Sequence, residues 1–261
     1  MKQNQHTLFL VLVLFTSFIS LNLSAQIDTI SLTNKDLVIS QLQQGLHQYL
    51  VYFEQPKKKK IIMPMLWNRQ VNFKQFQGKA AIEVVQNWYS NDTLQNRYIY
   101  SISSREDFSP IYHYGKNARG IEAFEFEQNR VSGSDTVANN SKKEMEVKST
   151  ASTLNWELDM EIFSMLPFKI VGQTFVINFY HPGGKTEPMY YQYKVIGSEA
   201  IQGTNTSTID CWQLKISYNE TSWAIFWISK KSKEVLKMQE YFGGGYRYKV
   251  KLATPVPPTR P

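Results

Sequence analysis

Residues 208–252 read TIDCWQLKISYNETSWAIFWISKKSKEVLKMQEYFGGGYRYKVKL. Apolar side chains alternate with neighbours along this stretch, for example at Trp212, Leu214 and Ile216. A period of two is typical of β-strands that bury one face. The three glycines at 243–245 interrupt the pattern and indicate a turn or bulge. The stretch therefore predicts a series of strands joined by short turns.

The same period extends toward the N-terminus, where Tyr98, Tyr100 and Ile102 would share one face of a strand. Residues 154–166 are an exception, because their apolar side chains recur at helical spacing and Pro167 follows them. The residues on that shared helical face are Leu154, Leu158, Ile162 and Met165. This spacing predicts a helix of about three turns. We expect Glu157 and Glu161 to form its solvated side.

The composition indicates a packed globular protein. The chain has 261 residues, a net charge of +7, 42% hydrophobic residues and 20% charged residues. These values exclude a polytopic membrane protein, a coiled coil and a disordered polyelectrolyte. The aromatic share of 14% favours strands, because flat rings pack well on a pleated surface. The single cysteine, Cys211, excludes an intrachain disulfide and a cysteine-based metal site.

The two ends of the chain have their own compositions. Residues 1–25 combine Lys2, an apolar run and a small-residue end at Ala25, which is the layout of a secretory signal peptide. We therefore expect cleavage near Ala25 and export to the periplasm or cell surface of a Gram-negative bacterium. Residues 253–261 are rich in proline and predict a disordered tail. Residues 26–252 show no internal linker and predict a single β-rich domain.

No motif for catalysis or metal binding occurs in the chain. The histidines after the signal peptide, His47, His113 and His181, share no short spacing, and there is no G-x-S-x-G elbow. We therefore expect a protein that is not an enzyme, with no catalytic residues, metal or cofactor. We expect no nucleic-acid partner, because the protein is predicted to be exported.

Two groups of residues are candidates for binding. Aromatic side chains could line a pocket for an acyl chain or a sugar face, although most rings serve as core. The candidate ring residues are Tyr98, Tyr100, Tyr112, Phe124, Phe126, Tyr193, Trp212 and Trp227. The run Lys57, Lys58, Lys59 and Lys60 could contact an anionic headgroup, and its alternative reading is a solvated hairpin tip.

The order of motifs in the second half resembles a known family. A helix ending at Leu166-Pro167-Phe168 precedes the segments Gly172-Gln173-Thr174-Phe175, Tyr193-Lys194-Val195-Ile196-Gly197-Ser198-Glu199 and Phe226-Trp227-Ile228-Ser229. Over residues 154–252 this order resembles the exported bacterial family called domain of unknown function 3108. The resemblance implies a mainly β fold with one large curved antiparallel sheet, a half-open β-barrel, wrapped around a short helix. That shape is similar to the periplasmic lipoprotein carriers LolA and LolB.

Two functions of different classes follow as hypotheses. The first is an exported, non-enzymatic binding or carrier protein that holds an apolar or amphipathic ligand, such as a lipid or a lipoprotein acyl chain, against the concave aromatic face. The second is a cell-envelope structural or assembly factor that acts through contacts with a membrane surface or an envelope protein. Lipid adducts would favour the first, and a single dominant protein partner would favour the second.

Overall fold

The computed structural model describes residues 26–203 and 207–253. The predicted signal peptide, residues 1–25, and residues 254–261 of the predicted tail lie outside the described residues. Within those limits, none of the helices is long and apolar enough to cross a membrane.

The described residues form one sheet of sixteen strands, in the order β1-β11-β12-β13-β14-β15-β16-β2-β3-β4-β5-β6-β7-β8-β9 with β10 beside β11. The strands are β1 (Ile27–Ile30), β2 (Gly45–Gln55), β3 (Lys60–Phe76), β4 (Lys79–Ser90), β5 (Arg97–Ser104), β6 (Pro110–Asn117), β7 (Gly120–Glu127), β8 (Arg130–Gly133), β9 (Glu146–Lys148), β10 (Leu154–Asn155), β11 (Thr174–Tyr180), β12 (Met189–Gln202), β13 (Thr208–Asn219), β14 (Ser222–Ser229), β15 (Val235–Phe242) and β16 (Gly245–Lys251). Neighbours are antiparallel, except that β1 and β10 each run parallel to β11.

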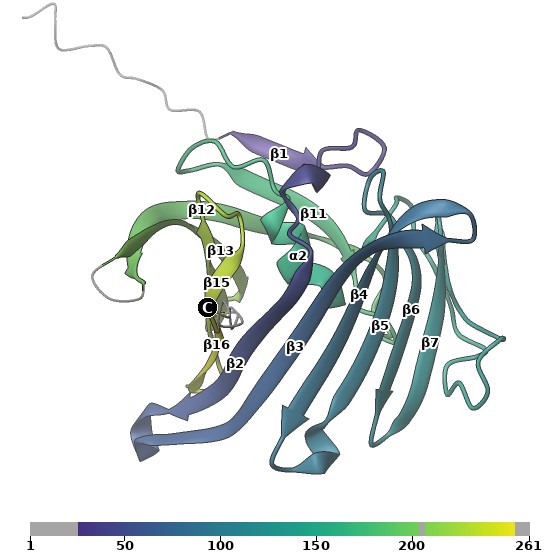
Figure 1. Ribbon diagram of the computed structural model, residues 1–261, viewed down its shortest axis with the longest axis horizontal. Helices are drawn as coiled ribbons and strands as arrows, with labels where there is room; N and C mark the ends of the chain where they lie inside the picture. Colours follow the sequence, from purple (N-terminus) through teal and green to yellow (C-terminus); the bar gives the residue numbers. More distant parts are fainter. Residues whose placement is uncertain (1–25, 204–206, 254–261) are drawn as a thin grey trace, which may run out of the picture.

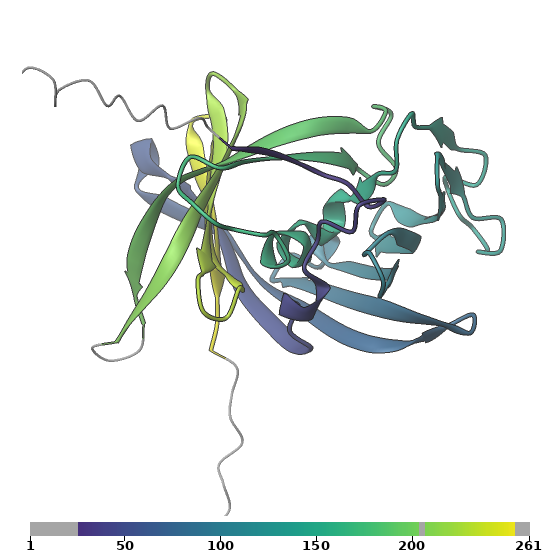
Figure 2. The ribbon, with the colours of Figure 1, turned by 90° about the horizontal axis from the view of Figure 1, so that it is seen from above.

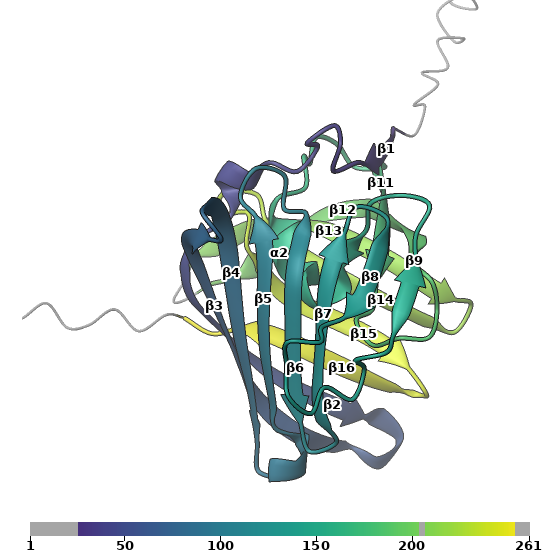
Figure 3. The ribbon, with the colours of Figure 1, turned by 90° about the vertical axis from the view of Figure 1, so that its right-hand side faces the viewer.

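The sheet curves strongly and stays open between its two ends, as Figures 1 and 3 show. The pairing of β16 with β2 joins the C-terminal half to the N-terminal half, so that both contribute to one continuous surface. The α-helix α2 (Asp159–Ser164) lies in the hollow of the sheet (Figures 1 and 2). This arrangement confirms the expected mainly β fold with a half-open curved sheet around a short helix.

The core fills the hollow around α2. Side chains from the inner faces of both halves, among them Val71, Val84 and Phe226, pack in one apolar cluster with Ile162 and Phe163 of the helix. Burial of apolar surface contributes about 25 cal/mol per Å² and is the main stabilising force for such a cluster. The hollow near α2 is therefore filled by the protein's own side chains.

The predicted helix over residues 154–166 is shorter than its apolar spacing indicates. Leu154 and Asn155 pair with β11 as strand β10, and a 3₁₀ turn, η4 (Trp156–Leu158), precedes α2. The Asn155 side chain accepts a hydrogen bond from the Glu157 amide, so it caps the turn and ends the strand. The predicted apolar face is nevertheless buried throughout, because the segment is in contact with the sheet on several sides. These contacts, more than helical propensity, decide its conformation.

The lysine run lies where the sequence predicts an exposed tip. Beyond Gln55 the chain turns through the 3₁₀ helix η2 (Pro56–Lys58) into β3. Lys59 adopts a left-handed conformation with φ of 50°, which closes the hairpin. All four lysines are exposed. The shorter turns η1 (Ile39–Gln41) and η3 (Thr93–Gln95) complete the described helical elements.

Candidate functional site

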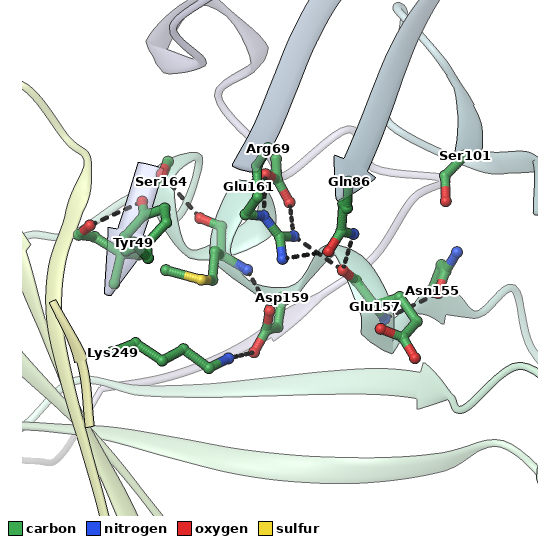
Figure 4. A network of polar contacts seen from close by, with 12 residues as sticks. Tyr49, Arg69, Gln86, Ser101, Asn155, Glu157, Asp159, Glu161, Ser164 and Lys249 are labelled. Atoms are coloured by element: carbon green, nitrogen blue, oxygen red, sulfur yellow. Dashed lines mark hydrogen bonds and ion pairs between the residues drawn. The ribbon is translucent and has the colours of Figure 1, made fainter. Parts of the chain in front are cut away.

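The hollow of the sheet contains three ion pairs that hold the helical segment. Alternate residues of η4 and α2 carry carboxylates, and each meets a cation from a different strand. Figure 4 shows two of these pairs, Glu161 with Arg69 and Asp159 with Lys249. The pairs are Glu157 with Arg97 at 2.8 Å, Asp159 with Lys249 at 3.9 Å, and Glu161 with Arg69, whose Nε donates at 2.9 Å. The expectation of a solvated glutamate side is therefore wrong. Both sides of α2 face protein, so these carboxylates needed buried partners.

Arg69 is the most deeply buried of the three cations. Its guanidinium donates to both carboxylate oxygens of Glu161, to the Gln86 side chain and to the Glu157 carbonyl. Burial alone would lower the pKa of Arg69, but the charge of Glu161 and its hydrogen bonds raise the pKa overall. Four of the five N–H donors of the guanidinium thus bond to the protein itself, and two of its acceptors, Glu157 and Glu161, belong to the helical segment, so Arg69 holds α2 in place.

Two stacked tryptophans lie next to these ion pairs. The Trp67 and Trp88 rings are 3.7 Å apart with an interplanar angle of 9°. The Lys249 amine lies 4.8 Å from the Trp67 ring centre, and the Arg97 guanidinium lies 5.0 Å from that of Trp88. Burial lowers the pKa of Lys249. A stack with a cation at each end is a cation–π arrangement, and it adds to the attachment of the helical segment.

His113 joins a second polar group in the hollow. Its Nδ1 lies 2.9 Å from Ser101 Oγ and 3.0 Å from Asn155 Nδ2, which donates to it. Burial lowers the pKa of His113 to about 4, so the ring is neutral near pH 7. Ser101 and His113 are each only 1% exposed. A serine closed to solvent cannot reach a substrate, so we interpret the pair as a structural link between the sheet and β10.

A cleft of about 330 Å³ opens between two hairpin tips, the β2–β3 tip and the β15–β16 tip. Its apolar lining comes from Phe53, Ile62, Phe242 and Tyr246. Lys57 and Lys58 also line it, and no ion pair occupies either amine among the described residues. Glu54 is its one acidic lining residue. Glycines 243–245 bring backbone close, since a Cβ on Gly245 would lie 3.0 Å from the Glu54 carbonyl. The cleft therefore combines apolar walls with free cations.

The predicted ring residues do not gather at one site. Strand register places Tyr98, Tyr100 and Tyr112 on the outer face, opposite the buried Ile99 and Ser101. Trp227 also lies on the outer face, where its Nε1 donates to Glu199 at 2.8 Å. The expected concave placement is wrong for these four, because the alternation of each strand turned the opposite side chains inward.

The other four predicted ring residues do face inward. Tyr193 is buried in the main core, and Phe124 and Phe126 belong to a smaller cluster with Tyr180. Trp212 packs at the edge of the core, stacked on Phe168 at 6.1 Å. These four rings pack against other side chains on the concave face, so their first role is in the core.

Sequence reasoning missed the buried cations, although a signal for them exists. Arg69 shares strand parity with Trp67 and Val71, and Arg97 shares parity with Ile99. A charged residue at an otherwise apolar position of an alternating strand indicates a buried ion pair. Cys211 is buried, and burial raises the pKa of its thiol to about 11. Across residues 26–203 and 207–253, no three His, Cys, Asp or Glu side chains cluster in a way that could hold a metal ion.

Comparison with known proteins places the chain in a family. The family model described as "Protein of unknown function (DUF3108)" matches residues 48–251. The chain belongs to the DUF3108 family. The match begins near the start of β2, so membership extends well beyond the resemblance seen over residues 154–252 and includes the N-terminal half of the sheet.

Other comparisons with this DUF3108 chain are more distant. A solved DUF1329 family protein from Desulfovibrio piger is similar to it at 10% identity with a TM-score of 0.31, covering 85% of this chain and 88% of that chain. No curated protein matches the chain.

Proposed function

We propose that this DUF3108 protein is an exported, non-enzymatic binding or carrier protein for an amphipathic ligand with an acidic head. The observation that carries the proposal is the cleft between the hairpin tips, where apolar walls adjoin Lys57 and Lys58 without ion-pair partners among the described residues. An apolar body would bury against Phe53 and Phe242, and an acidic head would be drawn to the amines. Export rests on the predicted signal peptide.

The direct test is recovery of the ligand. Protein purified from its own host should be analysed by native mass spectrometry and by lipid extraction. A co-purifying amphiphile with a phosphate or carboxylate head supports the carrier. Protein without any such molecule, together with one dominant protein partner in cellular crosslinking, would instead support the envelope assembly factor.

The lysine run provides a sharper test on the surface. Changing Lys57, Lys58, Lys59 and Lys60 together to Gln should weaken binding to vesicles of phosphatidylglycerol and phosphatidylcholine at low salt by about tenfold or more, since each cation near an anionic surface contributes about 1 kcal/mol. The difference should shrink near 0.15 M salt, where the Debye length is about 8 Å. Vesicle sedimentation over a salt series measures both effects.

A matched control separates the cluster from total charge. Lys79, Lys143, Lys169 and Lys185 are exposed and scattered, and replacing them by Gln removes the same charge. This control should keep most of the vesicle binding, while both variants should unfold at the parent's temperature because exposed charges contribute little. Equal loss in the two variants would mean that net charge alone attracts the vesicles and that the cleft has no role.

A further inference from the structure

Five aromatic side chains form a continuous surface on the outer face of the sheet, here named the aromatic strip. They come from four neighbouring strands, β2, β16, β15 and β14, and each is half-buried. The members are Tyr52, Tyr248, Tyr246, Tyr241 and Trp223. Because Lys249 and Met238 on the same strands point into the hollow, their neighbours in the strip must point away from it.

The rings of the strip lie in contact at mixed angles. Tyr52 and Tyr248 are stacked at 5.1 Å and 24°, and Trp223 and Tyr241 are stacked at 6.1 Å and 28°. Tyr246 joins the two pairs, tilted by 31° to Tyr248 and by 51° to Tyr241, and it meets Trp223 edge-on at 66°. The strip is therefore one continuous surface of half-buried rings that present both faces and edges.

The charged side chains that border the strip are unevenly distributed, with lysines on one side and a glutamate on the other. Lys215 and Lys194 continue the outer face beyond the Trp223 end on β13 and β12. Lys237 lies opposite Trp227, further along β14, with its amine 4.4 Å from that ring centre. None of the three has an ion pair among the described residues. The Lys215 amine lies 5.8 Å from the Trp223 ring centre. Gln239 lies within the strip and donates to the Tyr248 hydroxyl at 3.1 Å. The acidic Glu54 lies on the β2 side of the strip, directly opposite Tyr246.

We propose that the aromatic strip binds an acidic polysaccharide, such as a chain of uronic acid residues. A sugar ring has a flat C–H face that packs on an aromatic ring and hydroxyl edges that bond to amide and phenol groups. Several adjoining half-buried rings suit a chain with repeated flat units, and Lys215 and Lys194 beyond the Trp223 end complement its carboxylates. A lipid chain would cover the polar Gln239 side chain and the phenol hydroxyls without offering them a hydrogen-bond partner of its own.

The test uses oligogalacturonate as the probe and oligodextran as its neutral counterpart. Titration calorimetry at 0.15 M salt should give an affinity for oligogalacturonate at least fivefold above that for oligodextran. The double variant Trp223→Thr/Tyr241→Thr should lose at least tenfold in affinity for oligogalacturonate. Threonine suits a strand, so the variant should fold, and thermal unfolding checks this. Lys194→Gln/Lys215→Gln should lower the affinity and flatten its salt dependence.

The outer tyrosines of β5 and β6 supply the control, because Tyr98→Thr/Tyr112→Thr removes two rings outside the strip. This control should bind oligogalacturonate as the parent does. The proposal is overturned by absent binding, by equal affinity for the two glycans, or by equal loss in the strip and control variants. It is also overturned if the strip variant changes only a self-association of the protein in solution. Trp223 and Tyr241 do not line the cleft, so either result leaves the vesicle experiment intact.

Discussion

Replacing Glu161 by Ala is expected to lower the free energy of unfolding by about 3–5 kcal/mol. The change leaves the guanidinium of Arg69 buried at 2% exposure with its charge uncompensated. It also releases the helical segment from β3, which α2 contacts through this pair. Urea unfolding followed by tryptophan fluorescence measures the loss, as a shift of the midpoint at constant slope.

Two comparisons separate the buried pair from general effects of losing a carboxylate. Glu106→Ala breaks the exposed pair with Lys35 and should leave the urea midpoint unchanged. The double change Arg69→Met/Glu161→Leu removes both charges and should recover most of the stability, because burying an ion pair carries a desolvation cost that apolar residues avoid. If Glu161→Ala is as stable as the parent, α2 is held by its apolar contacts alone.

The second large effect concerns pH and His113. Its pKa is about 4 in the folded protein against 6.5 in the unfolded chain, so the unfolded state binds the proton more readily. The contribution of neutral His113 is fully present above pH 6.5 and is lost as the pH falls from 6.5 to about 4. At 1.36 kcal/mol per pKa unit, the total loss over this window is about 3 kcal/mol.

Unfolding free energies measured between pH 4 and 7 test this expectation. The variant His113→Gln should show a weaker dependence on pH in that window than the parent. Burial also lowers the pKa of His181, so the difference between parent and variant isolates His113. The carboxylates Glu157 and Glu234 have lowered pKa values and affect stability below about pH 4.5. Parallel pH curves for parent and variant would contradict a neutral buried His113.

Local sequence patterns predicted the strands because side-chain alternation is a property of each strand by itself. Tyr98 and Tyr100 do share a face, with Ile99 and Ser101 on the other. The pattern could not tell which face turns inward, because that depends on the curvature of the whole sheet. By residue type, the tyrosines are as suitable for a core as Ile99, yet the inward face carries the small Ser101, which lies opposite His113 and bonds to it.

The sequence predicted the two turns that form the candidate cleft, but not that they meet. The run of four lysines indicated an exposed tip, and the three glycines at 243–245 indicated a turn. These tips lie nearly 190 residues apart in the chain and meet because β16 pairs with β2. No local pattern specifies that pairing, since each strand could form hydrogen bonds with several others.

The sequence by itself determined a mainly β protein, the exposed lysine tip and the apolar side of the helical segment. Each of these depends on residues within a few positions of one another. Only the tertiary structure decided that Glu161 meets Arg69, 92 residues away, and that five rings from four strands adjoin on the outer face. Such contacts are set by the closing curvature and register of the entire sheet, because burial and charge pairing act between whatever residues the fold brings together.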